Sequence, residues 1–218
     1  MLDIAEYAPD LFAVNIGNFS AETAMVMEGR GSVWSVDMGV GMSVSRLDGG
    51  MDELEARFLN GMASVPEDPS TLAFVDLGAG TVYSLDTRTG AYEVAIQDVP
   101  ALKSALDAAV VIGINGTQFR EGEPDMLYRT KSFKDGHFGR VAIDPLADHQ
   151  AGPVEVLFRC EQSGARDDFT FDAEDNAWLT SSPRDTVLEL EAREWDAQVV
   201  VDETSVVAGP TARGHCMW

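Results

Sequence analysis

The sequence predicts an all-β protein, a β-propeller of four-stranded blades with about four and a half blades in the chain, so that the ring is incomplete. Two observations predict this fold: a unit of short β-rich runs separated by turn residues recurs along the chain, and segments with helical spacing are few. The copies begin near Glu6, Asn60, Asn115, Asp167 and Gly209, which by subtraction are 54, 55, 52 and 42 residues apart. Propeller blades have this period.

The clearest copy spans residues 58–98. Its β-rich runs are separated by Pro-Glu-Asp-Pro, Gly-Ala-Gly and Thr-Arg-Thr-Gly, and each of these separators is rich in residues that form turns. In its last run the larger apolar residues Tyr92, Val94 and Ile96 alternate with Glu93, Ala95 and Gln97. This two-residue period is typical of a strand with one buried face.

The same order of runs and turns recurs in other parts of the chain. A second copy starts at "GINGTQF", a third covers "RDDFTFDAEDNAWLTSSPRDTVLELEAREWDAQVVVDE", and an earlier partial copy contains "APDLFAVNIGNFS" and "GSVWSVDMG". The final "SVVAGPTARGHCMW" opens a further unit that does not complete. We therefore interpret this segment as the start of a fifth repeat unit, whose ending "GPTARGHCMW" has no strand signal.

Two segments have helical spacing, residues 52–59 and residues 99–109, and Pro100 suits the first turn of the second helix. We expect both to be connections between blades. A long parallel α/β domain would need many more helical segments between its strands.

The composition excludes several classes of function. Lys and Arg total 15 against 37 Asp and Glu, and the net charge of -22 would repel the phosphates of nucleic acid. No apolar run approaches the roughly 18 residues of a membrane span, and the N-terminal sequence lacks the basic-then-apolar order of a secretory signal. Cys160 and Cys216 are too few for a disulfide scaffold, so they are free thiols or one optional bridge.

The missing part of the ring has consequences for stability and assembly. Propellers avoid exposed strand edges by closing in a ring of roughly four to eight blades. We therefore interpret residues 1–218 as one propeller domain that is truncated at both ends, and expect self-association through its open blade edges.

Four short motifs carry a resemblance to a known family: "FLNGM", "GINGTQF", "DDFTFDAEDNAWLT" and "AGPT". With them, nearly the whole chain resembles the senescence-marker-protein/gluconolactonase family of six-bladed propellers, also called the regucalcin-like family. The segments "IAEYAPDLFAVNIGNFS" and "GSVWSVDM" look like the fungal branch of that family, which includes hetero-Diels-Alderases of natural-product pathways. The resemblance implies six blades in a closed ring and a small-molecule substrate in the central channel.

The resemblance also implies a set of site residues. In the metal-dependent members one Glu, two Asn and one Asp converge on a divalent cation, and the positions that match the two Asn and the Asp are Asn60, Asn115 and Asp167. The family's Glu lies in a blade that precedes this chain. Glu6 is a further residue that we expect to face the channel, although nothing aligns it with the missing ligand. Ca²⁺ or Mg²⁺ bound by three such oxygen ligands and water would be held weakly.

Three functional classes remain open at this point. A cyclase of the hetero-Diels-Alderase type would use Asn60 and Asn115 to position substrates and hydrogen-bond a carbonyl, without a cofactor. A lactone hydrolase would use Ca²⁺ or another divalent metal, with Asp167 as ligand and general base. A binding propeller or an inactive remnant would have no catalytic site, and its Asn-Gly and Asp-Asp pairs would only satisfy backbone groups at tight turns.

Four further residues are weaker candidates. Tyr128 and Lys131 are expected to point into the channel as substrate-binding residues, and Asp168 beside Asp167 is a candidate of the same kind. His137 lies in the Gly-flanked segment "KDGHFGR", where a solvent-facing histidine is expected. No Gly-x-Ser-x-Gly sequence surrounds any serine, which disfavours a serine hydrolase.

Overall fold

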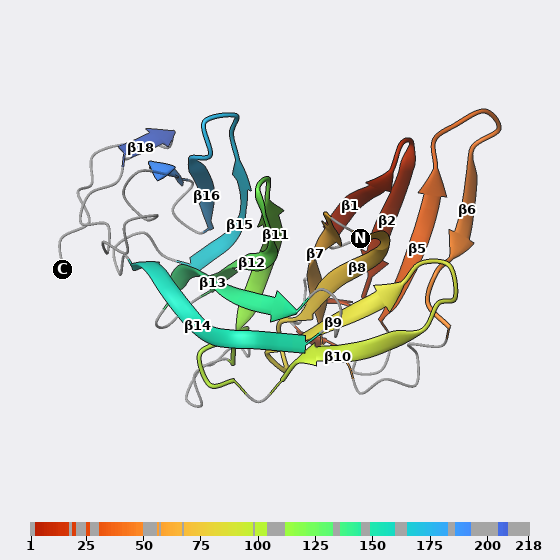
Figure 1. The fold of residues 1–218 in the computed structure, drawn as a ribbon, viewed down its shortest axis with the longest axis horizontal. Coiled ribbons are helices and arrows are strands. Elements are labelled where there is room, and N and C mark those ends of the chain that lie inside the picture. Colours follow the sequence, from red (N-terminus) through yellow and green to blue (C-terminus); the bar gives the residue numbers. More distant parts are fainter. Residues whose placement is uncertain are drawn as a thin grey trace.

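The computed structural model describes residues 3–17, 19–20, 25–26, 31–49, 56, 58–66, 68–97, 99–103, 112–132, 136–144, 149–159, 165–182, 186–192 and 205–208. These residues form four antiparallel four-stranded sheets and one two-stranded hairpin. The sheets follow one another in the chain and are arranged as successive blades (Figure 1). The prediction of an all-β propeller is confirmed, with four blades in the described part of the chain.

The first two blades come from the N-terminal half. The first has the order β1-β2-β5-β6, and a short hairpin, β3 with β4, is inserted between its second and third strands. The second has the order β10-β9-β8-β7. Their strands are β1 (Asp3–Ala8), β2 (Leu11–Ile16), β3 (Phe19–Ser20), β4 (Met25–Val26), β5 (Ser32–Asp37), β6 (Ser43–Arg46), β7 (Leu59–Val65), β8 (Asp68–Asp76), β9 (Thr81–Asp86) and β10 (Tyr92–Ile96).

The third and fourth blades repeat this arrangement. Each has its strands in chain order, β11-β12-β13-β14 and β15-β16-β17-β18. Their strands are β11 (Ile114–Arg120), β12 (Glu123–Lys131), β13 (His137–Asp144), β14 (His149–Arg159), β15 (Ala165–Phe171), β16 (Ala177–Ser182), β17 (Thr186–Leu190) and β18 (Ser205–Ala208).

The turns of the second blade form where the sequence predicted them. Gly80 and Gly90 have φ angles of 68° and 74°, and their N–H groups close turns by donating to the carbonyls of Asp76 and Asp86 at 2.8 Å. Glycine is favoured there because it adopts a positive φ without steric cost.

The hydrophobic core lies between adjacent blades. Ala13 and Val33 of the first blade pack with Phe74 and Leu85 of the second, and all four are buried. Similar clusters join the second blade to the third and the third to the fourth. Each blade therefore buries one face against each neighbour, which is what stacks the sheets in sequence order.

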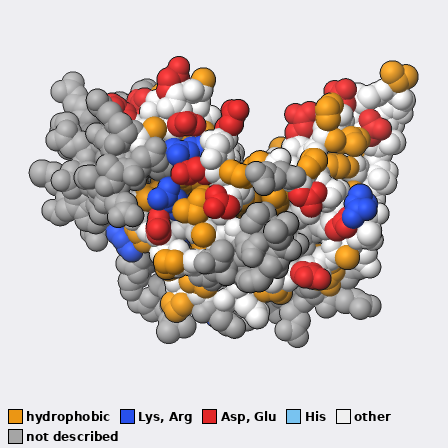
Figure 2. Space-filling view, viewed as in Figure 1, with side chains coloured by type: hydrophobic (Ala, Val, Ile, Leu, Met, Phe, Trp, Pro, Cys, Tyr) orange, Lys and Arg blue, Asp and Glu red, His pale blue; other side chains and the backbone are white. Residues whose placement is uncertain are grey.

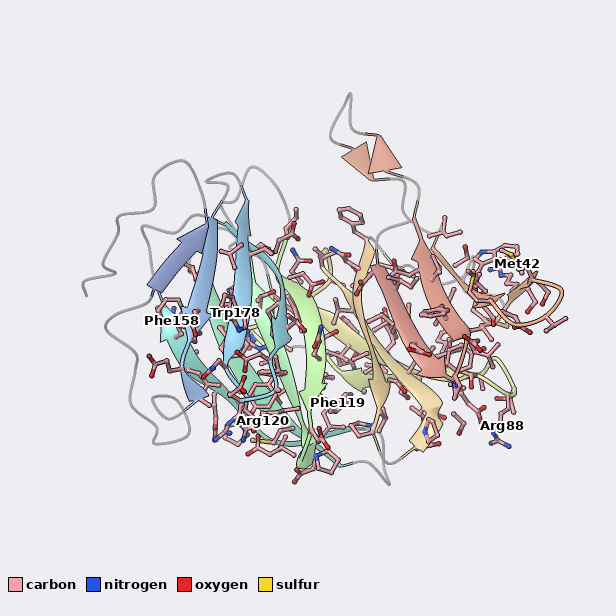
Figure 3. The ribbon with its side chains drawn as sticks, turned by 90° about the horizontal axis from the view of Figure 1, so that it is seen from above. Met42, Arg88, Phe119, Arg120, Phe158 and Trp178 are labelled. Carbon is pink, nitrogen blue, oxygen red and sulfur yellow. The ribbon has the colours of Figure 1, made fainter. Side chains whose placement is uncertain are left out.

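The first strand of each blade lies beside the first strand of the next. The inner strands β1, β7, β11 and β15 are neighbours in this order, as Figure 3 shows from above. Figure 2 shows a hollow in the molecular surface between the first blade and the fourth, with acidic side chains outnumbering basic ones on this face.

Two expectations about the chain require correction. Residues Ser205–Ala208 pair with β17 as the outer strand of the fourth blade, and so do not open a fifth blade; residues 209–218 lie outside the described part. The expected helix at residues 99–109 begins with a turn, in which Leu102 N–H donates to Val99, and its remainder is not described. Leu59, the last residue of the other expected helix, begins β7.

Within the part of the chain that the structure describes, no helix is long and apolar enough to cross a membrane.

The first blade exposes several large apolar side chains, namely Ile4, Ile16, Met38, Val40, Met42 and Val44. Met42 lies at the end of the molecule opposite Phe158 and Trp178 (Figure 3). Exposed apolar side chains of this kind are suited to contact with another chain or another blade.

The Asn-Gly pairs are not hairpin turns, because both lie inside inner strands. A Cβ atom on Gly61 would stand 2.0 Å from the carbonyl oxygen of Asn115, and one on Gly116 would stand 2.3 Å from Asp168 Oδ1. Glycine is therefore needed at these positions because neighbouring inner strands approach too closely for a side chain.

We expect Gly61→Ala to lower the free energy of unfolding by about 1–3 kcal/mol, because the added methyl group forces β7 away from β11. Chemical denaturation measures this loss. Gly152→Ala is the control, since its methyl group would meet only the Ala142 methyl group at 3.3 Å. Equal stability of the two variants would contradict the close approach of the inner strands.

Candidate functional site

Each inner strand carries polar side chains at or near its first residue. Asp3 is the first residue of β1, Asn60 and Asn115 are the second residues of β7 and β11, and Asp167 and Asp168 are the third and fourth residues of β15. We refer to these five residues as the inner-strand cluster. Because the inner strands are neighbours, four blades contribute to one polar group.

The structure brings Asn60, Asn115 and Asp167 together. Asn60 Nδ2 donates to Asn115 Oδ1 at 2.6 Å, and Asn115 Nδ2 donates to Asp167 Oδ1 at 2.8 Å. Asn115 Nδ2 also donates to Ser132 Oγ at 2.9 Å. The three residues that the sequence placed at the same point of successive copies thus form one hydrogen-bonded row across three blades.

The first blade joins this row through two residues that sequence reasoning missed. Asp3 Oδ2 accepts from the Met62 N–H at 2.5 Å, and Asn15 Nδ2 donates to the Asn60 carbonyl at 2.6 Å. Asn15 Oδ1 in turn accepts from the Asp3 N–H at 2.8 Å. The repeat itself could have revealed Asp3, because it precedes Asn60 by 57 residues, close to the spacing of the other copies.

Glu6 lies apart from the inner-strand cluster. It is exposed near the end of β1, where its Oε1 accepts from the Asp10 N–H at 3.2 Å. Asp10 has a φ of 62° in the turn between β1 and β2. In this structure Glu6 therefore supports a turn instead of contributing to the cluster.

Tyr128 lies in the core between the third and fourth blades. Its ring is fully buried, stacks on Phe138 with centroids 6.0 Å apart and meets Phe171 edge-on at 5.1 Å. Its hydroxyl donates to Glu123, while Arg140 Nη1 donates to that hydroxyl at 3.1 Å. Burial is the main reason that the pKa of Tyr128 is raised above its usual range.

Lys131 and His137 are also buried, with exposed fractions of 6% and 2%. Lys131, the last residue of β12, is the cross-strand partner of His137, the first residue of β13. The expectation that His137 faces solvent is therefore wrong. It failed because His137 is the first residue of β13, where its ring bonds to Arg129 and is buried.

The carboxylates of the cluster influence one another. Burial is the largest cause of a raised pKa for Asp168, at about 6, and the negative charges of Asp3 and Asp167 add to it. Much of Asp168 is exposed, but its Oδ1 lies against Gly116 and accepts from the Phe169 N–H at 2.8 Å. Burial also raises the pKa of Asp3. The site therefore carries acidic groups that repel one another.

No protein-family model and no curated protein sequence matches this chain. Solved structures do match it. A luciferin-regenerating enzyme has a TM-score of 0.59 and 15% identity over 94% of this chain and 61% of its own. A nidogen/laminin complex has a TM-score of 0.63 and 11% identity over 94% of this chain and 64% of the matched one.

A calcium-binding regucalcin from Agrobacterium tumefaciens has a TM-score of 0.54 and 17% identity over 99% of this chain and 63% of its own. The chain spans less than two thirds of each of these three matched chains. Relative to its six-bladed neighbours, the chain is a partial propeller. At these identities the similarity shows the fold alone, so function has to be argued from the inner-strand cluster.

The cluster offers oxygen atoms to a ligand. Asn60 Oδ1, Asp167 Oδ2 and Asp168 Oδ2 make no hydrogen bond to any described residue. Among the described residues, no group of three or more His, Cys, Asp or Glu side chains is arranged to hold a metal ion. A cation here would therefore need amide as well as carboxylate ligands, a donor set that Ca²⁺ and Mg²⁺ accept.

We expect the stability of the protein to fall as pH rises from about 4 to about 7, in part because of Asp168. Its folded-state pKa lies above its ordinary value, so its contribution is complete below the ordinary value and is lost as pH rises through about 6. Chemical denaturation across this range should show a shallower pH dependence for Asp168→Asn. The control is Asp125→Asn, an exposed acid of the third blade; equal slopes in Asp168→Asn and wild type would contradict the assignment.

Proposed function

We propose that this chain belongs to an enzyme that hydrolyses a lactone, or a similar small ester, at the inner-strand cluster with a weakly held divalent cation. The observation that carries the proposal is the set of oxygen atoms on Asn60, Asp167 and Asp168 that face no hydrogen-bond donor in the described chain. Amide and carboxylate oxygens are the ligands that hard divalent cations prefer.

The polarity of the cluster favours this reaction over catalysis by hydrogen-bond donors. The side-chain N–H groups of Asn60 and Asn115 already donate within the row. A substrate carbonyl that gains negative charge would also meet the acidic groups of Asp3, Asp167 and Asp168. A cation removes that repulsion, because it neutralises the carboxylates that would otherwise oppose the developing charge.

The roles of the residues follow from their positions. Asn60 and Asp167 would hold the cation, and Asn115 would orient both through its two hydrogen bonds. A cation held there would polarise the lactone carbonyl and lower the pKa of a nearby water. Asp168 takes one proton from the water that attacks the carbonyl carbon, and returns it to the ring oxygen when the ring C–O bond breaks. The product is a hydroxy acid.

A second candidate is a cofactor-free cyclase of the hetero-Diels-Alderase type, to which the fungal-branch resemblance points. The raised pKa of Asp168, about 6, is the specific observation in its favour. A protonated carboxyl group can donate a hydrogen bond to a carbonyl and so promote cycloaddition. In that case the rate should fall as pH rises through about 6 and should not respond to chelators. A non-catalytic binding propeller would show neither behaviour.

We expect Ca²⁺, Mg²⁺, Mn²⁺ or Zn²⁺ at millimolar concentration to bind the wild-type chain and raise its melting temperature. Asn60→Ala and Asp167→Asn should weaken this binding roughly tenfold or more, because each removes a ligand. Titration calorimetry and thermal unfolding with each metal chloride measure the effect. Hydrolysis of simple γ- and δ-lactones, followed by acid release, measures the activity.

Asn176→Ala is the matched control. Asn176 also holds two segments with its amide, donating to Asp172 at 3.1 Å and accepting from Ala192 at 3.0 Å, but it lies outside the inner-strand cluster. The Asn176→Ala variant should be less stable than wild type but should still bind the metals and gain melting temperature from them. The absence of any heat or melting shift with all four metals, or an unchanged response in Asp167→Asn, would remove the hydrolase proposal and favour the alternatives.

A further inference from the structure

Arg129 of β12 is a buried cation with unsatisfied donors. The residue has an exposed fraction of 0%, and its Nη2 donates to His137 Nε2 at 2.9 Å. Its Nε and Nη1 have no hydrogen-bond partner. None of the described carboxylates forms an ion pair with it. Buried guanidinium groups are almost always paired, so this one requires an explanation.

The hydrogen bond to His137 does not supply the missing negative charge. A guanidinium group can only donate, so His137 Nε2 accepts and the imidazole is neutral, with its proton on Nδ1. Burial, and secondarily repulsion from Arg159, lower the pKa of Arg129 to about 9. Arg129 is therefore still positively charged at neutral pH, beside a second cation.

Thr117 supplies a further orphan donor at the same place. It has an exposed fraction of 1%, and its Oγ1 has no partner. Thr117 is the direct cross-strand partner of Arg129 in the pairing of β11 with β12. Side chains of such partners start about 5 Å apart and on one face of the sheet.

That face is turned toward the second blade. Phe119 and Leu127, each two residues from Thr117 and Arg129 along the strands, pack with Val75 and Val82 of the second blade. Residues two apart in a strand share a face. The orphan donors of Thr117 and Arg129 therefore lie on the side of the third blade that meets the second.

We propose that Arg129 and Thr117 bind a small monovalent anion, of the size of chloride, enclosed between the second and third blades. One buried positive charge calls for one negative charge, and Nε–H, Nη1–H and Oγ1–H are all donors. Complete burial of both residues limits the ligand to a monatomic or similarly small ion, and excludes sulfate or an organic phosphate. Water would satisfy the donors but would leave the charge uncompensated.

The proposed anion site has the opposite local charge to the inner-strand cluster, where carboxylates gather and a cation is favoured. In a chain of net charge -22, an anion would bind only where the local potential is positive. Arg129 and Arg159 repel one another closely enough to affect the pKa of Arg129, which makes this part of the third blade such a place.

Thermal and chemical unfolding in sodium chloride and in sodium gluconate at equal ionic strength test the proposal, since gluconate is too large to enter. For the wild-type chain we expect chloride to stabilise: above its dissociation constant, each tenfold rise in chloride should lower the unfolding equilibrium constant about tenfold. Arg129→Met should abolish the difference between the two salts. Arg88→Met, which removes a guanidinium group with 71% of its side chain exposed, should preserve it.

Two outcomes would overturn the proposal: equal stability of the wild-type chain in both salts, or the same chloride response in Arg129→Met as in wild type. Should Arg129→Met not fold, Thr117→Val provides the second variant, because it keeps the side-chain shape and removes one donor. It should weaken the chloride response several-fold, and an undiminished response would count against the site. Crystals grown in bromide should show an anomalous peak beside the Arg129 guanidinium, and a vacant position there would refute it.

Discussion

The first strand of every blade has an edge that faces the axis of the propeller and has no strand beside it to complete a ladder. This structure links those edges with side chains. Asn15 and Asp3 bond β7 to the first blade, Asn60 bonds to Asn115, and Asn115 bonds to Asp167. These bonds are directional, whereas the apolar clusters between the sheets attract without a fixed direction. Glycine follows both asparagines because the strands that these bonds bring together leave no room for a methyl group.

The same interaction produces the candidate site. Polar groups placed at the start of each inner strand meet at one point, so the residues that align the blades also concentrate acidic groups. The raised pKa values of Asp3 and Asp168 show that this arrangement opposes ionisation. A structure that only needed to align its blades could use neutral amides throughout. The retention of repelling carboxylates is the physical reason to look for a cation or a proton-transfer role at this place.

The third blade combines two different charged environments on its two faces. Toward the fourth blade, Arg140 bonds to Glu155 at 2.8 Å and to the Tyr128 hydroxyl, so this arginine has a carboxylate partner beside a buried aromatic ring. Toward the second blade, Arg129 has no carboxylate partner among the described residues. Arg129 is also the more deeply buried of the two arginines, with an exposed fraction of 0%, so the missing countercharge matters more on that face. An enclosed anion would make the two faces equivalent in their electrostatic balance.

The sequence by itself determined the repeat, the strand content and the equivalence of Asn60, Asn115 and Asp167, because turn residues, two-residue alternation and blade period are local patterns written along the chain. Tertiary structure decided the rest. Glu6 and Asp3 lie three residues apart in one strand, yet only Asp3 meets the second blade. Tyr128 and His137 became core residues, and Ser205–Ala208 joined the fourth blade. Which neighbour covers a side chain depends on how whole sheets pack, and that packing arises from contacts between residues about fifty positions apart that no local pattern records.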